Sequence, residues 1–156
     1  MKRGGQRVRT TANVHAQFTQ ADLRAAVAGL RGTVSFQAPL RDYTSFKIGG
    51  PADVLVEPAD IEDVCLLVQQ ARARKVPFFL LGGTNLLVRD GGIRGIVISL
   101  ARLRGIEEEP EFTLYAEGGV GMPTLIGHAI RHSLAGLEWA AGIPGTVAGC
   151  VVMNAG

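Results

Sequence analysis

Glycine constrains this sequence more than any other residue, because the glycines gather where apolar runs begin or end. The chain has 21 glycines in 156 residues, nearly double the usual share of about 7%. They follow no fixed period, which excludes collagen and repeat architectures. The clusters are Gly49-Gly50, Gly82-Gly83, Gly91-Gly92, Gly118-Gly119 and Gly142 to Gly149. Such clusters predict loops of special backbone geometry, or loops whose backbone comes close to another group.

The positive net charge of the chain does not indicate a nucleic-acid partner, because it comes from the N-terminal residues alone. The total is +2, but residues 1–10 carry Lys2, Arg3, Arg7 and Arg9 and no acid. Removing these from the 16 basic residues leaves 12 against 14 acidic ones. We therefore expect no basic face and no nucleic-acid partner. Residues 1–18 are expected to form a basic, disordered extension, and residues 19–156 a single globular domain.

The two cysteines and the longest uncharged run help to predict the cellular compartment of the protein. Cys65 and Cys150 form no CxxC pair, and Cys65 falls within an apolar helical pattern that predicts a buried, reduced thiol. No signal peptide is visible at the basic start. The 18 residues from Trp139 to Gly156 carry no charge, but Pro144 and the glycines predict buried loop and strand rather than a membrane helix. We expect a cytoplasmic protein without membrane insertion.

Hydrophobic periodicity predicts alternating helices and strands, and hence an α/β or α+β fold. Thr19 and Asp60 are predicted to begin helices as N-caps, and Pro123 suits a first helical position. The expected helices run from Thr19 to Gly32, from Asp60 to near Lys75, and from Pro123 to Gly136, with Leu125, Ile126, Ala129, Ile130 and Leu134 as the apolar face of the last. The expected strands are 53–57, 78–81, 95–100 and 112–117, and the second of these is expected to be buried.

The loop Gly82-Gly83-Thr84-Asn85 follows a short apolar run. Glycines allow successive backbone N–H groups to converge on an anion, and Thr84 and Asn85 add uncharged donors. The loop lacks the Gly-Lys-Ser/Thr ending of a P-loop and does not fit GxGxxG. A phosphate-binding loop and a plain tight turn remain equal alternatives on these residues alone.

A second uncharged glycine-rich stretch favours the phosphate-binding alternative over the plain turn. Gly142-Ile143-Pro144-Gly145-Thr146 is followed by Gly149, and neither stretch contains lysine or arginine. Two such loops in one small domain predict a long ligand with a diphosphate, held mainly by backbone groups.

Several polar residues and one aromatic residue could be taken as functional, but we expect each to have an ordinary structural role. His128 and His132 are four residues apart, a spacing that can bind zinc, but no third ligand lies near them in the sequence. We therefore expect no metal site, and both imidazoles on the polar face of a helix. The acidic residues Glu107, Glu108, Glu109 and Glu111 are expected to form a solvated turn. Trp139 is expected in the core.

Three stretches together carry a resemblance to a known family. "YTSFKIGGPADVLVEP", "LGGTNLLVRDGGIRGIVISL" and "GLEWAAGIPGTVAGCVVMNAG" occur in that order between residues 36 and 156. In sequence and spacing they resemble the UDP-N-acetylenolpyruvoylglucosamine reductases, which are flavoenzymes of peptidoglycan precursor synthesis. The resemblance implies an α+β fold of the vanillyl-alcohol-oxidase/PCMH type, in which two small α/β subdomains clasp FAD. It also implies NADPH as co-substrate and a UDP-sugar as substrate.

The same resemblance assigns expected cofactor contacts. The pyrophosphate loop would be Gly82, Gly83, Thr84 and Asn85, and the second wall would be Ile143, Pro144, Gly145 and Thr146. Leu86, Gly142 and Gly149 would be further cofactor contacts, with Tyr43 in the segment that leads to the flavin and Asn154 near its ring. Chains of this family are about twice as long, so the substrate domain and the catalytic residues are expected after Gly156, and this chain alone is expected to be catalytically incomplete. Another oxidoreductase of the same flavin fold and a non-catalytic nucleotide-binding module are the alternatives.

Overall fold

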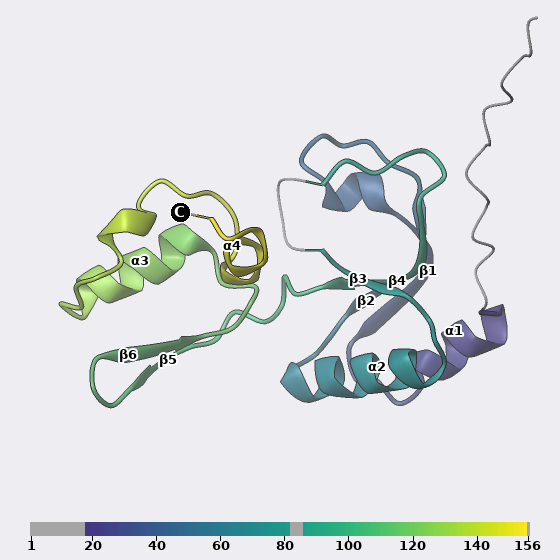
Figure 1. Ribbon diagram of the computed structural model, residues 1–156, viewed down its shortest axis with the longest axis horizontal. Helices are drawn as coiled ribbons and strands as arrows, with labels where there is room; N and C mark the ends of the chain where they lie inside the picture. Colours follow the sequence, from purple (N-terminus) through teal and green to yellow (C-terminus); the bar gives the residue numbers. More distant parts are fainter. Residues whose placement is uncertain (1–17, 82–85, 156) are drawn as a thin grey trace, which may run out of the picture.

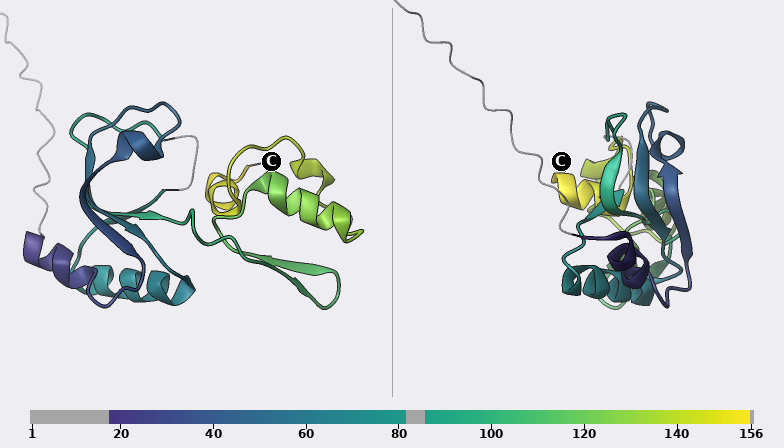
Figure 2. Two further views of the ribbon diagram at one scale, coloured as in Figure 1. Left: turned by 180° about the vertical axis from the view of Figure 1, so that it is seen from behind. Right: turned by 90° about the vertical axis from the view of Figure 1, so that its right-hand side faces the viewer.

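The computed structural model describes residues 18–81 and 86–155. Figure 1 shows two lobes that are joined by the segment between β4 and β5. The first lobe holds α1, α2 and a sheet made of β1 to β4, and the second holds a hairpin with α3 and α4. Figure 2 shows the same separation from behind. The expected α+β class is thus observed.

The helices and strands of the two lobes have the following bounds. The first lobe contains α1 (Gln20–Ala26), β1 (Thr33–Pro39), η1 (Leu40–Tyr43), β2 (Pro51–Glu57), α2 (Ile61–Ala73), β3 (Phe78–Leu81) and β4 (Ile93–Ser99). The second contains β5 (Ile106–Glu109), β6 (Thr113–Ala116), α3 (Met122–Arg131), η2 (Glu138–Ala140) and α4 (Val147–Met153).

Within the described residues, the first-lobe sheet has the order β1-β2-β4-β3. β1 pairs antiparallel with β2, whereas β2, β4 and β3 run parallel. Except for Asp53 and Ser99, the buried residues of the central strands β2 and β4 are apolar, as expected of strands covered on both faces. β3 lies at the edge, which leaves one side of it open toward the second lobe.

The sheet separates two apolar cores. Helices α1 and α2 cover one face, where their residues pack against alternate residues of β2 and β4 (Figure 1). The core on that face contains Leu23, Ala26, Val54, Val56, Leu67, Ala71, Val76, Ile96 and Ile98. The core on the opposite face contains Ala38, Leu40, Ala52, Leu55, Leu81, Val88 and Val97.

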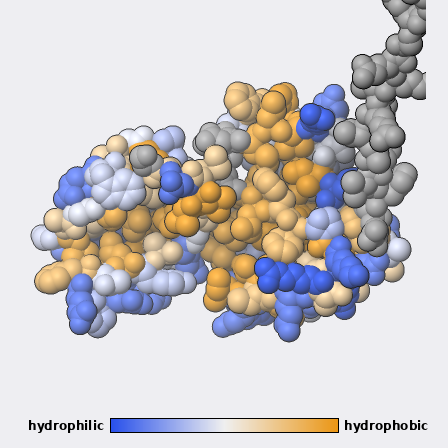
Figure 3. Space-filling model, viewed as in Figure 1, coloured by the Kyte–Doolittle hydropathy of each residue, from blue (hydrophilic) through white to orange (hydrophobic). Residues whose placement is uncertain are grey.

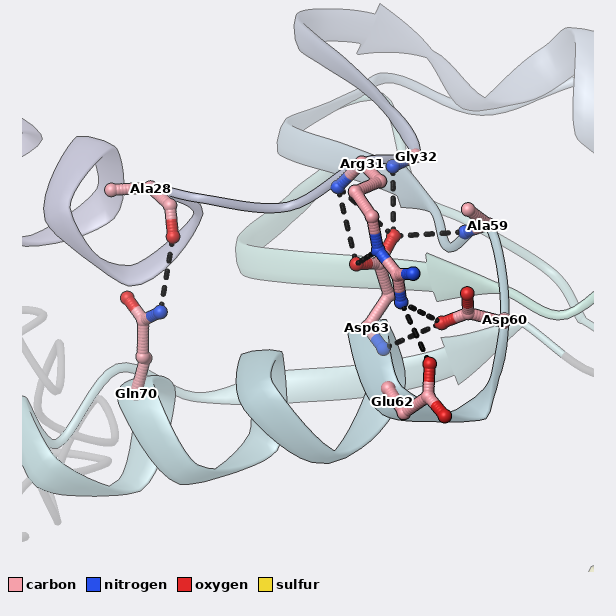
Figure 4. A network of polar contacts seen from close by, with 8 residues as sticks. All are labelled: Ala28, Arg31, Gly32, Ala59, Asp60, Glu62, Asp63 and Gln70. Carbon is pink, nitrogen blue, oxygen red and sulfur yellow. Dashed lines mark hydrogen bonds and ion pairs between the residues drawn. The ribbon is translucent and has the colours of Figure 1, made fainter.

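The predicted helix starts are confirmed. Thr19 caps α1 in a capping box with Asp22, and Asp60 caps α2 by accepting from the backbone N–H of Asp63 at 3.0 Å. The predicted end of α1 at Gly32 is wrong, because the helix ends at Ala26. The Asp63 carboxylate accepts from the N–H groups of Arg31 and Gly32, which fixes the bend that leads into β1 (Figure 4).

The second lobe has its own small core. β5 and β6 form an antiparallel hairpin, and Met122 and Leu125 of α3 pack in one core with its apolar residues. Pro123 lies in the first turn of α3 as expected. The helix ends at Arg131 rather than near Gly136, and Ile130 is exposed rather than part of the apolar face. The short hairpin covers a narrow stripe of the helix, so a neighbouring apolar residue stays in solvent.

The end of the described chain also differs from expectation. The predicted strand is instead α4, whose Val151, Val152 and Met153 are exposed. Trp139 lies in η2 and is exposed rather than in the core. Cys65 is exposed too, because α2 buries the stripe of Asp63, Leu67 and Ala71 and turns Cys65 away from it. Among residues 18–81 and 86–155, no helix is both long and apolar enough to cross a bilayer.

Candidate functional site: an apolar hollow between the lobes

A hollow of about 450 Å³ lies where the edge of the sheet faces α4. Its walls come from β3, from single residues before and after β4, and from α4 with the residues on either side of it. The lining residues are Phe78, Phe79, Leu80, Leu86, Leu100, Pro144, Gly145, Ala148, Gly149, Cys150, Val152, Met153 and Ala155. Figure 3 shows apolar residues gathered over this part of the surface. A hollow of this size falls within the range of small-molecule sites, about 300–1,000 Å³.

Apolar side chains and glycine backbone make up the walls of this hollow. Among the described lining residues none is charged, so any diphosphate here would rely on backbone or uncharged donors. Gly145 has φ +111°, and a Cβ built on it would meet no other atom within 4 Å. The space beside Gly145 is therefore open, and a side chain there would project into it.

The second wall is fixed by backbone hydrogen bonds to the segment before α3. Val147 donates to Val120 at 2.8 Å, Ala148 to Gly118 at 3.0 Å, and Met122 to Gly145 at 3.0 Å. Thr146 caps α4 by accepting from the N–H of Gly149 at 3.3 Å. These bonds hold the 145–149 stretch in one position relative to the hairpin and α3.

A smaller hollow of about 160 Å³ adjoins the first and shares Leu100 with it. Tyr43, Leu81, Ser99, Ala101, Gly119 and Thr146 complete its lining. Partial burial, together with the carboxylates of Glu57 and Asp42, raises the pKa of the Tyr43 phenol above its usual value. The phenol therefore stays protonated at neutral pH and can donate a hydrogen bond.

The structure brings only some of the expected cofactor contacts together. Leu86, Pro144, Gly145 and Gly149 line the larger hollow, whereas Tyr43 and Thr146 line the smaller one. Gly142, Ile143 and Asn154 are described but line neither hollow: Ile143 packs on the second-lobe core, and Asn154 is the left-handed C-cap of α4. Gly82, Gly83, Thr84 and Asn85 lie outside the described residues.

Phe79 and Leu80 are among the lining residues that sequence reasoning missed. Phe79 and Leu80 were expected in a buried strand, but they are 41% and 39% exposed, and both line the larger hollow. The expectation of burial is wrong because β3 is an edge strand whose open side faces α4. A run of large apolar residues directly before a glycine-rich loop was the available signal.

Comparison with known proteins agrees with this arrangement. The profile of a family described as "FAD binding domain" matches residues 52–156. The UDP-N-acetylenolpyruvoylglucosamine reductase of Rubrobacter xylanophilus is 54% identical over 123 residues, covering 78% of this chain and 41% of the relative. The reductase of the same name from Syntrophus aciditrophicus is 44% identical over 148 residues, covering 92% of this chain and 46% of the relative.

A solved structure gives the same result. The crystal structure of UDP-N-acetylenolpyruvylglucosamine reductase (MurB) from Thermus caldophilus superposes with a TM-score of 0.56 at 36% identity, covering 81% of this chain and 43% of that chain. The chain thus spans less than half the length of these relatives. The matches do not favour the non-catalytic module or another oxidoreductase of the flavin fold. The chain belongs to the FAD binding domain family, and the resemblance of its sequence to the UDP-N-acetylenolpyruvoylglucosamine reductases is confirmed.

Proposed function

We propose that the larger hollow receives part of FAD, with the flavin against the apolar wall and the phosphates toward the glycine-rich backbone. The observation that carries this proposal is the lining itself. Its apolar side chains suit a flat ring system, and the open space beside Gly145 suits a group that must approach the backbone closely. Tyr43 and Thr146, in the adjoining hollow, supply uncharged polar groups.

The complete protein to which this chain corresponds would be an NADPH-dependent reductase of the enolpyruvyl group of a UDP-sugar, acting in the cytoplasm in peptidoglycan precursor synthesis. Bound FAD would supply the hydride chemistry. The residues of this chain would bind the cofactor, orient it and exclude water from one of its sides. The residues that bind the sugar and protonate the product belong to the parts of the relatives that this chain does not match.

A matched pair of glycine substitutions tests the proposal. Gly145 and Gly136 have φ values of +111° and +105°, and a Cβ on either would meet no other atom within 4 Å. Valine at either position therefore introduces the same kind of backbone strain, about 1–3 kcal/mol. Gly145 lines the hollow and Gly136 does not.

We expect Gly145→Val to weaken FAD binding at least about tenfold, equivalent to about 1.4 kcal/mol, and Gly136→Val to leave it unchanged. The measurement is a flavin-fluorescence titration of the 156-residue chain and both variants, with thermal midpoints recorded in parallel. Equal FAD affinities for the two variants would reject the hollow as the cofactor site.

A further inference from the structure

Three potential metal ligands meet where the β5–β6 hairpin covers α3. One carboxylate oxygen of Glu108 lies 3.3 Å from Nε2 of His128 and 2.5 Å from Nδ1 of His132. The three ligand atoms all lie within 4.8 Å of one another. None of these residues lines either hollow between the lobes. No third ligand lies near the two histidines in the sequence, but the fold brings Glu108 beside them from a strand 20 residues earlier.

Elementary geometry of the two elements explains why the three residues meet. His128 and His132 are one helical turn apart, so their side chains project from the same face of α3 and its C-cap. Side chains alternate along β5, and Glu108 shares a face with Ile106, which packs on the second-lobe core beside α3. Glu107 and Glu109 belong to the opposite face of the hairpin.

His128 carries an unusual feature for a histidine beside a carboxylate. Its Nε2 is buried, yet among the described residues it makes no hydrogen bond. The carboxylate oxygen at 3.3 Å is close enough for an ion pair but is not aligned for a hydrogen bond. A buried polar atom without a partner is costly, and a cation held between this nitrogen and the carboxylate would give it one.

We propose that Glu108, His128 and His132 form a binding site for a divalent transition-metal ion of the zinc type, which fastens the β5–β6 hairpin to α3. Two imidazole nitrogens and one carboxylate oxygen are a ligand set that zinc accepts, with a fourth position left for water. Imidazole donors favour zinc, nickel or copper over magnesium and calcium. This site is independent of the proposed FAD site.

The distances fit this ligand set after a small movement of exposed groups. Two ligand atoms on a tetrahedral zinc, each bonded at about 2.1 Å, lie about 3.4 Å apart. The separation of His128 Nε2 from Glu108 is already 3.3 Å, whereas that of His132 Nδ1, at 2.5 Å, must lengthen. The imidazole rings are stacked with centroids 4.3 Å apart, and they must splay because a metal binds in the plane of each ring. Glu108 and His132 are exposed, so neither movement disturbs the core.

Zinc titration of the tag-free, chelator-treated 156-residue chain by calorimetry tests the site. The titration is run at a pH above the ordinary pKa of histidine, where the imidazoles are free to bind. We expect one saturable site. Loss of a residue that only supports a metal ligand typically costs 10–100-fold in affinity. Glu108, His128 and His132 are direct ligands, so His132→Ala, His128→Ala and Glu108→Gln should each weaken binding at least about tenfold.

Two control variants separate this site from accidental zinc binding. Glu107→Gln removes an acid from the same strand but from its other face, and His15→Ala removes the remaining histidine of the sequence. Both should bind zinc as the parent chain does. Zinc should also raise the thermal midpoint of the second lobe, followed through Trp139 fluorescence, in the parent and in both controls but not in His132→Ala.

The absence of saturable zinc binding would overturn the proposal. Undiminished binding by His132→Ala and Glu108→Gln, or loss of binding in His15→Ala, would overturn it as well. If His128→Ala does not fold, the two variants at exposed positions still decide the question. FAD affinity should be the same with and without zinc, so failure of this site would leave the proposed function untouched.

Discussion

Asp63 shows how one buried side chain can organise a connection between elements. It is 2% exposed, and its carboxylate accepts hydrogen bonds from the backbone N–H groups of Gly32 at 2.7 Å, Ala59 at 3.0 Å and Arg31 at 3.1 Å (Figure 4). Burial alone raises the pKa of this carboxyl, but the hydrogen bonds from Ala59, Arg31 and Gly32 outweigh burial and hold the pKa below its usual value. The charged form is therefore the stabilising one.

We expect Asp63→Asn to lower the free energy of unfolding by about 3 kcal/mol at neutral pH. At least one buried N–H loses its acceptor, at about 1–3 kcal/mol, and the others face a neutral acceptor in place of a charged one. Urea unfolding measures the change. Glu62→Gln is the control, because Glu62 only pairs with Arg31 in solvent, and it should change stability by less than about 1 kcal/mol.

The lowered pKa of Asp63 also fixes the sign of a pH effect. A carboxyl whose pKa is lower in the folded state contributes stability above its unfolded pKa of about 3.9 and loses that contribution as pH falls through the folded value. The parent chain should therefore lose stability toward acid more steeply than Asp63→Asn. Parallel acid profiles for the two proteins would contradict this assignment.

At the scale of the element, α1 depends on its cap and on its attachment to the sheet. The helix has only seven residues, too few to be stable by itself. Thr19 and Asp22 satisfy its first N–H groups in a capping box, and Leu23 and Ala26 bury its inner face. Local capping and tertiary packing thus act on the same short segment.

Thr19→Ala should lower the free energy of unfolding by about 1 kcal/mol, because it removes the cap side chain from a short helix. It should also raise the pKa of Asp22, which the Thr19 side-chain hydrogen bond and then the Thr19 backbone N–H hold below its usual value. NMR titration of the Asp22 carboxyl measures this. Thr19→Ser keeps the hydroxyl and should keep both the stability and the low pKa, so equal behaviour of the two variants would argue against the capping box.

At the scale of the whole molecule, the two lobes have separate cores. The first lobe buries apolar residues on both faces of its sheet, and the second buries Val120, Met122, Leu125 and Ala140 around its hairpin. Between them lies the hollow, whose apolar lining is open rather than packed. Few packed side chains therefore couple the unfolding of one lobe to that of the other.

We expect the lobes to unfold in two steps without cofactor. Trp139, the single tryptophan of the chain, lies in the second lobe, whereas far-UV circular dichroism also follows the helices and sheet of the first. The two signals should therefore give different midpoints in urea. Saturating FAD should bring the midpoints together, because a ligand between the lobes binds only when both are folded. Coincident midpoints without FAD would contradict separate unfolding.

The sequence alone determined the features that depend on near neighbours in the chain. Helix starts at Thr19 and Asp60 follow from the hydrogen-bonding capacity of the side chain, and β2, β3, β4 and β6 from apolar runs bounded by turn residues. β1 was not predicted, and the acidic residues of β5 were wrongly expected to form a solvated turn. The family was also recognisable, because three characteristic stretches occur in order along this chain. Whether Gly82 to Asn85 contact phosphate stays a prediction.

Only the tertiary structure decided the features that depend on which element lies against which. Phe79 and Leu80 line a hollow because β3 is at the edge of the sheet, and no property of four apolar residues reveals strand order. Arg31 and Gly32 lie beyond the end of α1, and their N–H groups bind Asp63, some 30 residues later. Glu108 meets His128 and His132 for the same kind of reason. Local sequence sets hydrogen bonding and periodicity along the chain, whereas contacts between distant residues arise only when the elements pack.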